Sequence, residues 1–143
     1  MSKIGLAALR VGMLFGSRDW VDIIERLRMP YNISAISQAG ALFAIEHESA
    51  FQEQIAAIIK QRENLFHRLK DLDGVSAWPS TTNFILFRAL AGTADQIFES
   101  LKGQNVLVKN VSGGHPLLQD CLRVTVGTPR ENELFFSALQ NSL

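Results

Sequence analysis

The sequence predicts an α/β fold in which a small, mixed sheet packs on long helices. Two observations support this prediction. In the first half of the chain, apolar residues from Phe51 to Leu69 recur at steps of three or four, which is the spacing of one helix face. Beyond Gly74 the pattern changes to short apolar runs that alternate with capped helical segments. Strands and helices in alternation indicate an α/β arrangement.

The first elements are predicted from glycine, serine and proline positions. Residues 11–16 are apolar and lie between glycines, which favours a buried strand. Ser17 is a suitable cap for a helix that Pro30 brings to an end. Residues 30–37 are predicted to form a turn or linker between this helix and the next helical region.

The second helical region is the strongest pattern in the sequence. Ile36 and Phe43 begin a helix that is expected to bend near His47. A long amphipathic helix then follows to the turn at Gly74, and its apolar stripe is interrupted at Arg62. Core packing is a sufficient explanation for this stripe.

Four strands are predicted after Gly74. Residues 75–78 and 83–89 are expected to pair as antiparallel strands joined by the polar turn at residues 79–82. Residues 105–110 and 121–127 supply the other two strands. We expect the resulting sheet to be mixed.

Two helices are predicted between and after these strands. Thr93 with Gln96 three positions later has the spacing of a capping box, and Gly103 is the expected end of that helix. Thr128 with Glu131 repeats the spacing at the last helix, where proline occupies the first helical position.

Composition excludes several classes of protein. The 143 residues contain 14 Lys and Arg against 14 Asp and Glu, so no basic excess favours nucleic acid or an anionic membrane surface. No apolar run approaches the roughly 20 residues that span a bilayer. Cys121 is the single cysteine, which excludes an intrachain disulfide and favours a cytoplasmic location, and we expect its side chain to be buried. The three histidines lie far apart in the sequence, so no metal site is predicted.

Lys3 and Arg10 are the candidates for chemistry near the N-terminus. Small apolar residues surround Lys3, and their desolvating effect favours the neutral amine that a Schiff base requires. The planar guanidinium of Arg10 can donate two parallel hydrogen bonds, which suits a phosphate. Pyridoxal phosphate carries an aldehyde, which the amine of Lys3 could bind, and a phosphate, which the guanidinium of Arg10 could bind. The two residues together therefore suggest this cofactor. A solvated surface lysine is the alternative reading of Lys3.

The segment SKIGLAALRVG resembles the cofactor-lysine signature of the fold-type I, pyridoxal-phosphate-dependent aminotransferases, and most closely that of the histidinol-phosphate aminotransferase family. The segments PYNIS, TTNFILF, VLVKN and CLRVTVGTPREN resemble the same family in the same order. Five ordered segments are more specific than one short motif. The resemblance covers essentially the whole chain.

The resemblance implies roles near the N-terminus. Lys3 would bind the aldehyde of pyridoxal 5'-phosphate and move a proton between the substrate and cofactor carbons. Arg10 would hold the cofactor phosphate. Ser2 would donate a hydrogen bond from its hydroxyl to that phosphate, although a structural serine is the alternative.

The resemblance also implies substrate-binding residues in the second half. Arg123 would hold the acidic end of the substrate, a carboxylate or a phosphate, whereas an arginine facing water is the alternative. Lys109 stands where many family members carry a second arginine for the phosphate; it keeps the charge but lacks the planar fork. Asn83 would lie near the active site, or would organise its turn.

The family places a large cofactor domain before the lysine, so the sequence resembles the C-terminal part of such an enzyme. Residues 1–30 are then expected to be the tail of the large domain, and residues 31–143 the small domain. The implied reaction is transfer of an amino group between histidinol phosphate and 2-oxoglutarate, with glutamate as the amino-acid partner, in a homodimer. A related aminotransferase for aromatic or other phosphorylated amines, and an inactive truncated module that associates with another chain, are the alternatives. The 143 residues alone are expected to be inactive.

Overall fold

The computed structural model describes residues 6–143, so Ser2 and Lys3 lie outside the described residues. The chain divides into two compact units, one that ends at Ile55 and one that runs from Ala56 to Leu143. Within residues 6–143, no helix is both long enough and apolar enough to cross a membrane.

The first unit is helical. The short 3-10 helix η2 (Ala7–Leu9) is followed by α1 (Arg18–Leu27) and α2 (Ala35–Glu46). Ser34 caps α2, because its hydroxyl accepts the N–H of Ser37 at 3.1 Å. The helix α3 (Glu48–Lys70) begins in this unit and continues into the next. The predicted break at His47 is confirmed, since this residue separates α2 from α3.

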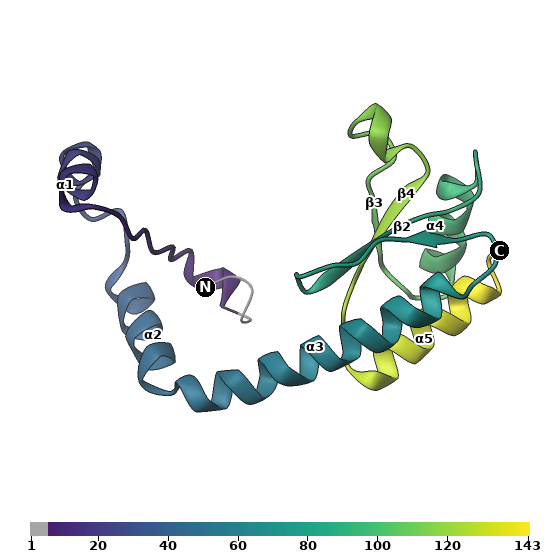
Figure 1. The fold of residues 1–143 in the computed structure, drawn as a ribbon, viewed down its shortest axis with the longest axis horizontal. Coiled ribbons are helices and arrows are strands. Elements are labelled where there is room, and N and C mark those ends of the chain that lie inside the picture. Colours follow the sequence, from purple (N-terminus) through teal and green to yellow (C-terminus); the bar gives the residue numbers. More distant parts are fainter. Residues whose placement is uncertain (1–5) are drawn as a thin grey trace. The chain divides into compact units, whose positions relative to one another are not determined.

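The second unit contains one sheet and the remaining helices, drawn in teal to yellow in Figure 1. Its strands are β1 (Ser76–Ala77), β2 (Phe84–Arg88), β3 (Lys109–Asn110) and β4 (Cys121–Thr125). Its other elements are α4 (Ala94–Gly103), the 3-10 helix η3 (Pro116–Leu118) and α5 (Pro129–Gln140).

The sheet has the strand order β1-β2-β4-β3, and each neighbouring pair is antiparallel. The prediction of an α/β fold is confirmed, but the prediction of a mixed sheet is wrong. Strands β2 and β3 run in the same direction, yet β4 lies between them and separates them. The connection through α4 therefore produces no parallel pair.

The core of the second unit lies between one face of the sheet and the helices α3, α4 and α5. Ile85 and Phe87 on β2 are fully buried, whereas Phe84, Leu86 and Arg88 alternate with them and are half-buried. This alternation is the two-residue period of a strand. The helices and β4 contribute most of the other core residues, which are Leu65, Leu69, Ile97, Leu101, Leu122, Val124, Phe135, Phe136 and Leu139.

Polar contacts attach the helices to the sheet. The guanidinium of Arg62 donates to the carbonyl of Thr82 at 3.2 Å, in the turn that precedes β2. This contact explains why the apolar stripe of α3 is interrupted at Arg62. The predicted capping box of α5 is present, with Thr128 and Glu131 bonded to each other in both directions.

Two predicted strands differ from the structure. Residues 11–16 form no strand, and Met13, Leu14 and Phe15 are exposed to 56%, 64% and 88%. A strand requires hydrogen bonds from a neighbouring backbone, and no described residue supplies them to this segment. The predicted strand at residues 105–110 is reduced to Lys109–Asn110, the part that pairs with β4.

The predicted capping box at Thr93 is also wrong. Thr93 has helical dihedral angles, and its hydroxyl donates to the carbonyl of Leu90 at 2.7 Å instead of capping α4. Gly103 stays within the helix, and Asn105, with φ of 60°, takes the left-handed position. Asparagine tolerates this conformation better than most residues.

Candidate functional site

Lys109 and Arg123 lie directly opposite each other on the neighbouring strands β3 and β4. Residues opposite each other in an antiparallel pair project from the same face of the sheet, with their Cβ atoms about 5 Å apart. Neither side chain forms an ion pair with another residue in the described part of the chain. Like charges placed this way destabilise a sheet, so the pair is a candidate anion-binding site.

The position of Arg123 is set by both of its neighbouring strands. Leu86 of β2 lies opposite it on one side and Lys109 on the other. Its guanidinium carbon lies 4.7 Å from the centre of the Phe84 ring, a favourable cation–π arrangement. The charged group is therefore supported by an aromatic surface, and it forms no ion pair with a residue in the part of the chain that the structure describes.

Asn83 immediately precedes β2, and its carbonyl accepts the N–H of Val126 at 2.9 Å. This bond continues the pairing of β2 with β4 by one residue. Asn83 lies three residues along β2 from Leu86, the residue opposite Arg123. The second unit therefore contains three predicted site residues, of which Lys109 and Arg123 are direct neighbours.

Arg10 belongs to the first unit, where it ends η2 with φ of 54° in the left-handed region. Its side chain is exposed and borders a hollow of about 180 Å³ lined by Leu6, Ala7, Val11 and Gly12. The guanidinium forms no ion pair with another described residue. A guanidinium group beside a hollow lined by small and apolar residues could bind a phosphate group.

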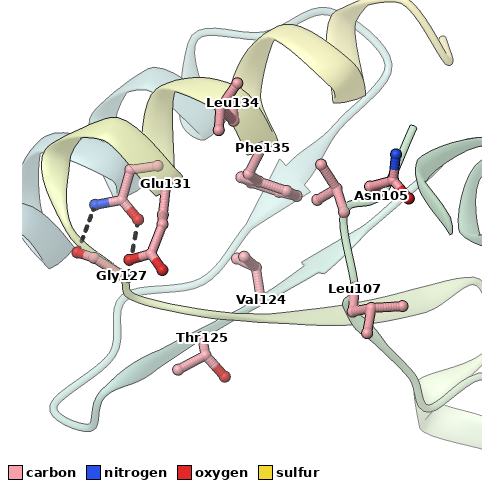
Figure 2. A pocket seen from close by; sticks show the side chains of 10 residues that line it. Asn105, Leu107, Val124, Thr125, Gly127, Glu131, Leu134 and Phe135 are labelled. Atoms are coloured by element: carbon pink, nitrogen blue, oxygen red, sulfur yellow. Dashed lines mark hydrogen bonds between the residues drawn. The ribbon is translucent and has the colours of Figure 1, made fainter.

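Figure 2 shows the pocket between β4, the start of α5 and the segment before β3. It has a volume of about 300 Å³, and apolar side chains such as Val106, Leu107 and Phe135 line much of it. Glu131 lies at its rim, where hydrogen bonds from the backbone N–H and the hydroxyl of Thr128 hold the pKa of its carboxyl below the usual value. Of the site residues within 6–143, neither Asn83, Lys109 nor Arg123 lines this pocket.

Arg88 and Asp120 make contacts around the start of β4 that the sequence did not predict. Arg88 donates to the carbonyls of Leu117 and Gln119 at 2.7 and 3.1 Å, so it fixes the loop between β3 and β4. Asp120 is buried, has φ of 57°, and accepts the N–H of Gly92 at 3.0 Å. An aspartate immediately before the apolar run of β4 is the only sequence signal that could have indicated it.

The lone cysteine is buried as predicted: Cys121 is fully inaccessible at the start of β4. Among residues 6–143, no three histidine, cysteine, aspartate or glutamate side chains are grouped in a way that could hold a metal ion.

Solved structures define the class of fold. The L-threonine-O-3-phosphate decarboxylase from Porphyromonas gingivalis superposes with a TM-score of 0.76 at 28% identity, over 88% of this chain and 39% of that one. The histidinol-phosphate aminotransferase from Sinorhizobium meliloti, solved in complex with pyridoxal-5'-phosphate, superposes with a TM-score of 0.82 at 23% identity, over 96% of this chain and 38% of that one. The α/β fold described above is thus a part of the fold of such enzymes.

The family model for aminotransferase class I and II matches residues 1–139, and the chain belongs to this family. Histidinol-phosphate aminotransferase 2 from Nitrosococcus oceani is 48% identical over 98% of this chain. The histidinol-phosphate aminotransferase from Polaromonas naphthalenivorans is 45% identical over all of it. The chain spans 39% of the length of each of these two relatives.

Proposed function

We propose that this chain is the C-terminal part of a pyridoxal-phosphate-dependent histidinol-phosphate aminotransferase. The whole enzyme transfers an amino group between histidinol phosphate and 2-oxoglutarate, with glutamate as the amino-acid partner. Membership of the aminotransferase class I and II family supports the reaction type. The names of relatives that are 48% and 45% identical across the chain support the substrate.

The observation that carries this proposal is the cation pair formed by Lys109 and Arg123. A phosphate monoester carries close to two negative charges at neutral pH, and two adjacent cations match it better than one. Arg123 supplies the planar fork and Lys109 a compact second charge. The same arginine can hold the carboxylate of glutamate, so one site serves both substrates in turn.

The cofactor we propose is pyridoxal 5'-phosphate. When bound, it supplies an electron sink that stabilises negative charge on the substrate carbon. Arg10 would hold its phosphate, as the exposed guanidinium beside a small hollow allows. Ser2 would add a hydroxyl donor, and Lys3 would hold the aldehyde end.

Each proposed residue has one physical task. The amine of Lys3 would move the proton between substrate and cofactor carbons, for which it must be neutral part of the time. Arg123 and Lys109 would hold the acidic end of the substrate and so restrict its orientation. Asn83 lies three residues from Leu86, the residue opposite Arg123, so the alternation of β2 puts its side chain on the other face of the sheet, and the task proposed for it is to organise the turn before β2.

The domain organisation proposed here is the one that the family resemblance implies. Residues 1–30 form the tail of the large cofactor domain, and residues 31–143 form the small domain. We propose that the whole enzyme is a homodimer in the cytoplasm. The single cysteine, buried at the start of β4, supports a reducing compartment.

The proposal is tested on the full-length protein that carries this chain. We expect histidinol phosphate to be a far better substrate than histidinol, and Arg123→Ala and Lys109→Ala to remove most of that preference. Lys102→Ala is the matched control, because Lys102 is an exposed lysine on α4 that pairs with Glu99 at 3.2 Å. A preference for aromatic amines without phosphate would instead favour a related aminotransferase.

The cofactor assignment has its own test. Pyridoxal phosphate followed by borohydride should label Lys3 in the full-length protein. Absence of label there would overturn the assignment. Absence of label in the 143-residue chain alone is expected, because this chain spans only 39% of its relatives.

A further inference from the structure

Strand β3 is the edge of the sheet and contains only Lys109 and Asn110. Two residues form too short a ladder to fix a strand firmly, and the charges of Lys109 and Arg123 repel each other across it. We propose that Asn110 is a positioning residue that holds Lys109 opposite Arg123 and thereby sets the affinity for the substrate phosphate. This inference rests on the proposed function of the cation pair.

The side chain of Asn110 connects β3 to two other segments. Its amide nitrogen donates to the carboxylate of Asp95 at 2.6 Å, and Asp95 lies in the first turn of α4. Its amide oxygen accepts the backbone N–H of Ser112 at 2.9 Å. Both polar atoms of one side chain are therefore used to fix the edge strand against a helix and the loop that follows.

The connection continues through the loop to the start of β4. The hydroxyl of Ser112 accepts the N–H of Asp120 at 2.9 Å, and the carboxylate of Asp120 accepts the N–H of Gly92 at 3.0 Å. The N–H of Val111 donates to the carbonyl of Cys121 at 3.1 Å. The residues on both sides of the β3–β4 loop are thus joined to the segment that begins α4.

Asn110 acts on the anion through Lys109. Adjacent residues in a strand point to opposite faces, so Asn110 projects away from the face that carries Lys109 and Arg123. Losing its amide would leave the repulsion between the two cations unopposed at the sheet edge. The ammonium of Lys109 would then move away from Arg123, and a phosphate would lose one of two adjacent charges.

The test compares four variants of the full-length enzyme. Asn110→Ala and Asp95→Ala remove the bond between β3 and α4. Asp95→Asn keeps an oxygen acceptor for Asn110, and Glu99→Ala removes an exposed carboxylate of the same helix that pairs with Lys102. The readouts are kcat, the KM for histidinol phosphate, the KM for glutamate, and the competitive inhibition constant of inorganic phosphate.

We expect Asn110→Ala and Asp95→Ala to raise the KM for histidinol phosphate and the inhibition constant of phosphate. The rise should be about fivefold, which corresponds to the net free energy of one hydrogen bond. The KM for glutamate and kcat should change by less than about twofold, because Arg123 remains in place. Asp95→Asn and Glu99→Ala should resemble the unmodified enzyme. A uniform loss of activity towards both substrates in Asn110→Ala, or a loss in Asp95→Asn equal to that in Asp95→Ala, would overturn the inference.

A second measurement separates this inference from the proposed function. Inorganic phosphate is added to the full-length protein with its cofactor bound, and the amide chemical shifts of Lys109 and Arg123 are followed by NMR. If Lys109→Ala weakens phosphate binding but Asn110→Ala does not, the positioning role is wrong while the anion site stands. If phosphate shifts neither amide in the unmodified protein, the anion site and the inference both fail.

Discussion

The guanidinium of Arg68 on α3 holds both carboxylate oxygens of Glu133 on α5, with Nη1–Oε2 and Nη2–Oε1 distances of 2.6 and 3.1 Å. The same guanidinium lies 3.9 Å from the centre of the Phe136 ring. One arginine thus joins the two helices by an ion pair and by a stacked contact, in the region where Figure 1 shows α3 and α5 side by side.

Acid should weaken this link. The hydrogen bonds from Arg68 lower the pKa of the Glu133 carboxyl below its ordinary value of 4.5. A carboxyl with a lowered folded-state pKa stabilises the fold above its unfolded pKa, and this stabilisation is lost as pH falls through the folded pKa. We therefore expect the free energy of unfolding to fall as the pH drops below about 4.5, and Glu133→Gln to reduce that fall. Urea denaturation of both proteins at a series of pH values from neutral to acid measures this dependence on pH. If the free energy of unfolding depends on pH in the same way in both proteins, the prediction is wrong.

Gly127 should not tolerate a side chain. A Cβ at this position would lie 2.8 Å from Oε2 and 2.9 Å from Cβ of Glu131, the residue that completes the cap of α5. Gly127→Ala must displace that cap, so we expect a loss of about 1–2 kcal/mol in the free energy of unfolding. Gly113→Ala is the matched control, since nothing lies within 4 Å of its Cβ position. Equal stability of the two variants would show that the cap adjusts freely.

The stability of the fold should depend on the carboxylate of Asp120. Its carboxylate accepts the N–H of Gly92, and its backbone is left-handed with φ of 57°. Asp120→Ala leaves the Gly92 donor without this partner and places alanine in an unfavourable conformation, so we expect a loss of about 1–3 kcal/mol. Asp120→Asn keeps an acceptor and tolerates the backbone, and should lose less. Chemical denaturation distinguishes the two variants, and a larger loss for Asp120→Asn would contradict the argument.

Replacing one cation of the proposed site should affect stability and binding in opposite directions. In Lys109→Glu the repulsion across β3 and β4 becomes attraction, so the fold should gain a few tenths of a kcal/mol. The affinity for inorganic phosphate should be lost, because a carboxylate repels it. Lys109→Ala should show an intermediate stability. If Lys109→Glu is less stable than Lys109→Ala, the two side chains do not interact across the strands.

Sequence patterns predicted several local features correctly because neighbouring residues determine them. The break at His47, the antiparallel pairing of β1 with β2, and the capping box at Thr128 all follow from neighbouring residues. The Thr93 capping box was wrong because the same hydroxyl has a competing acceptor, the carbonyl of Leu90. Spacing alone does not show which of two partners a side chain selects.

The candidate site was predictable in part. The resemblance indicated Arg123 and Lys109. Their placement directly opposite each other depends on β4 lying between β2 and β3, and no local pattern fixes that strand order. Arg88 and Asp120 were missed because their partners lie about thirty residues away in the sequence. The strand predicted at residues 11–16 failed because a strand depends on a partner that the segment itself does not specify.

The short outer strands of the sheet have a consequence for how the protein behaves at high concentration. The two five-residue strands, β2 and β4, occupy the centre, and only the two-residue strands β1 and β3 lie at the edges. Long, flat edges act as templates on which further chains polymerise. A sheet whose edges present so little regular backbone resists that route to aggregation, and it does so without a proline or a bulge in either outer strand.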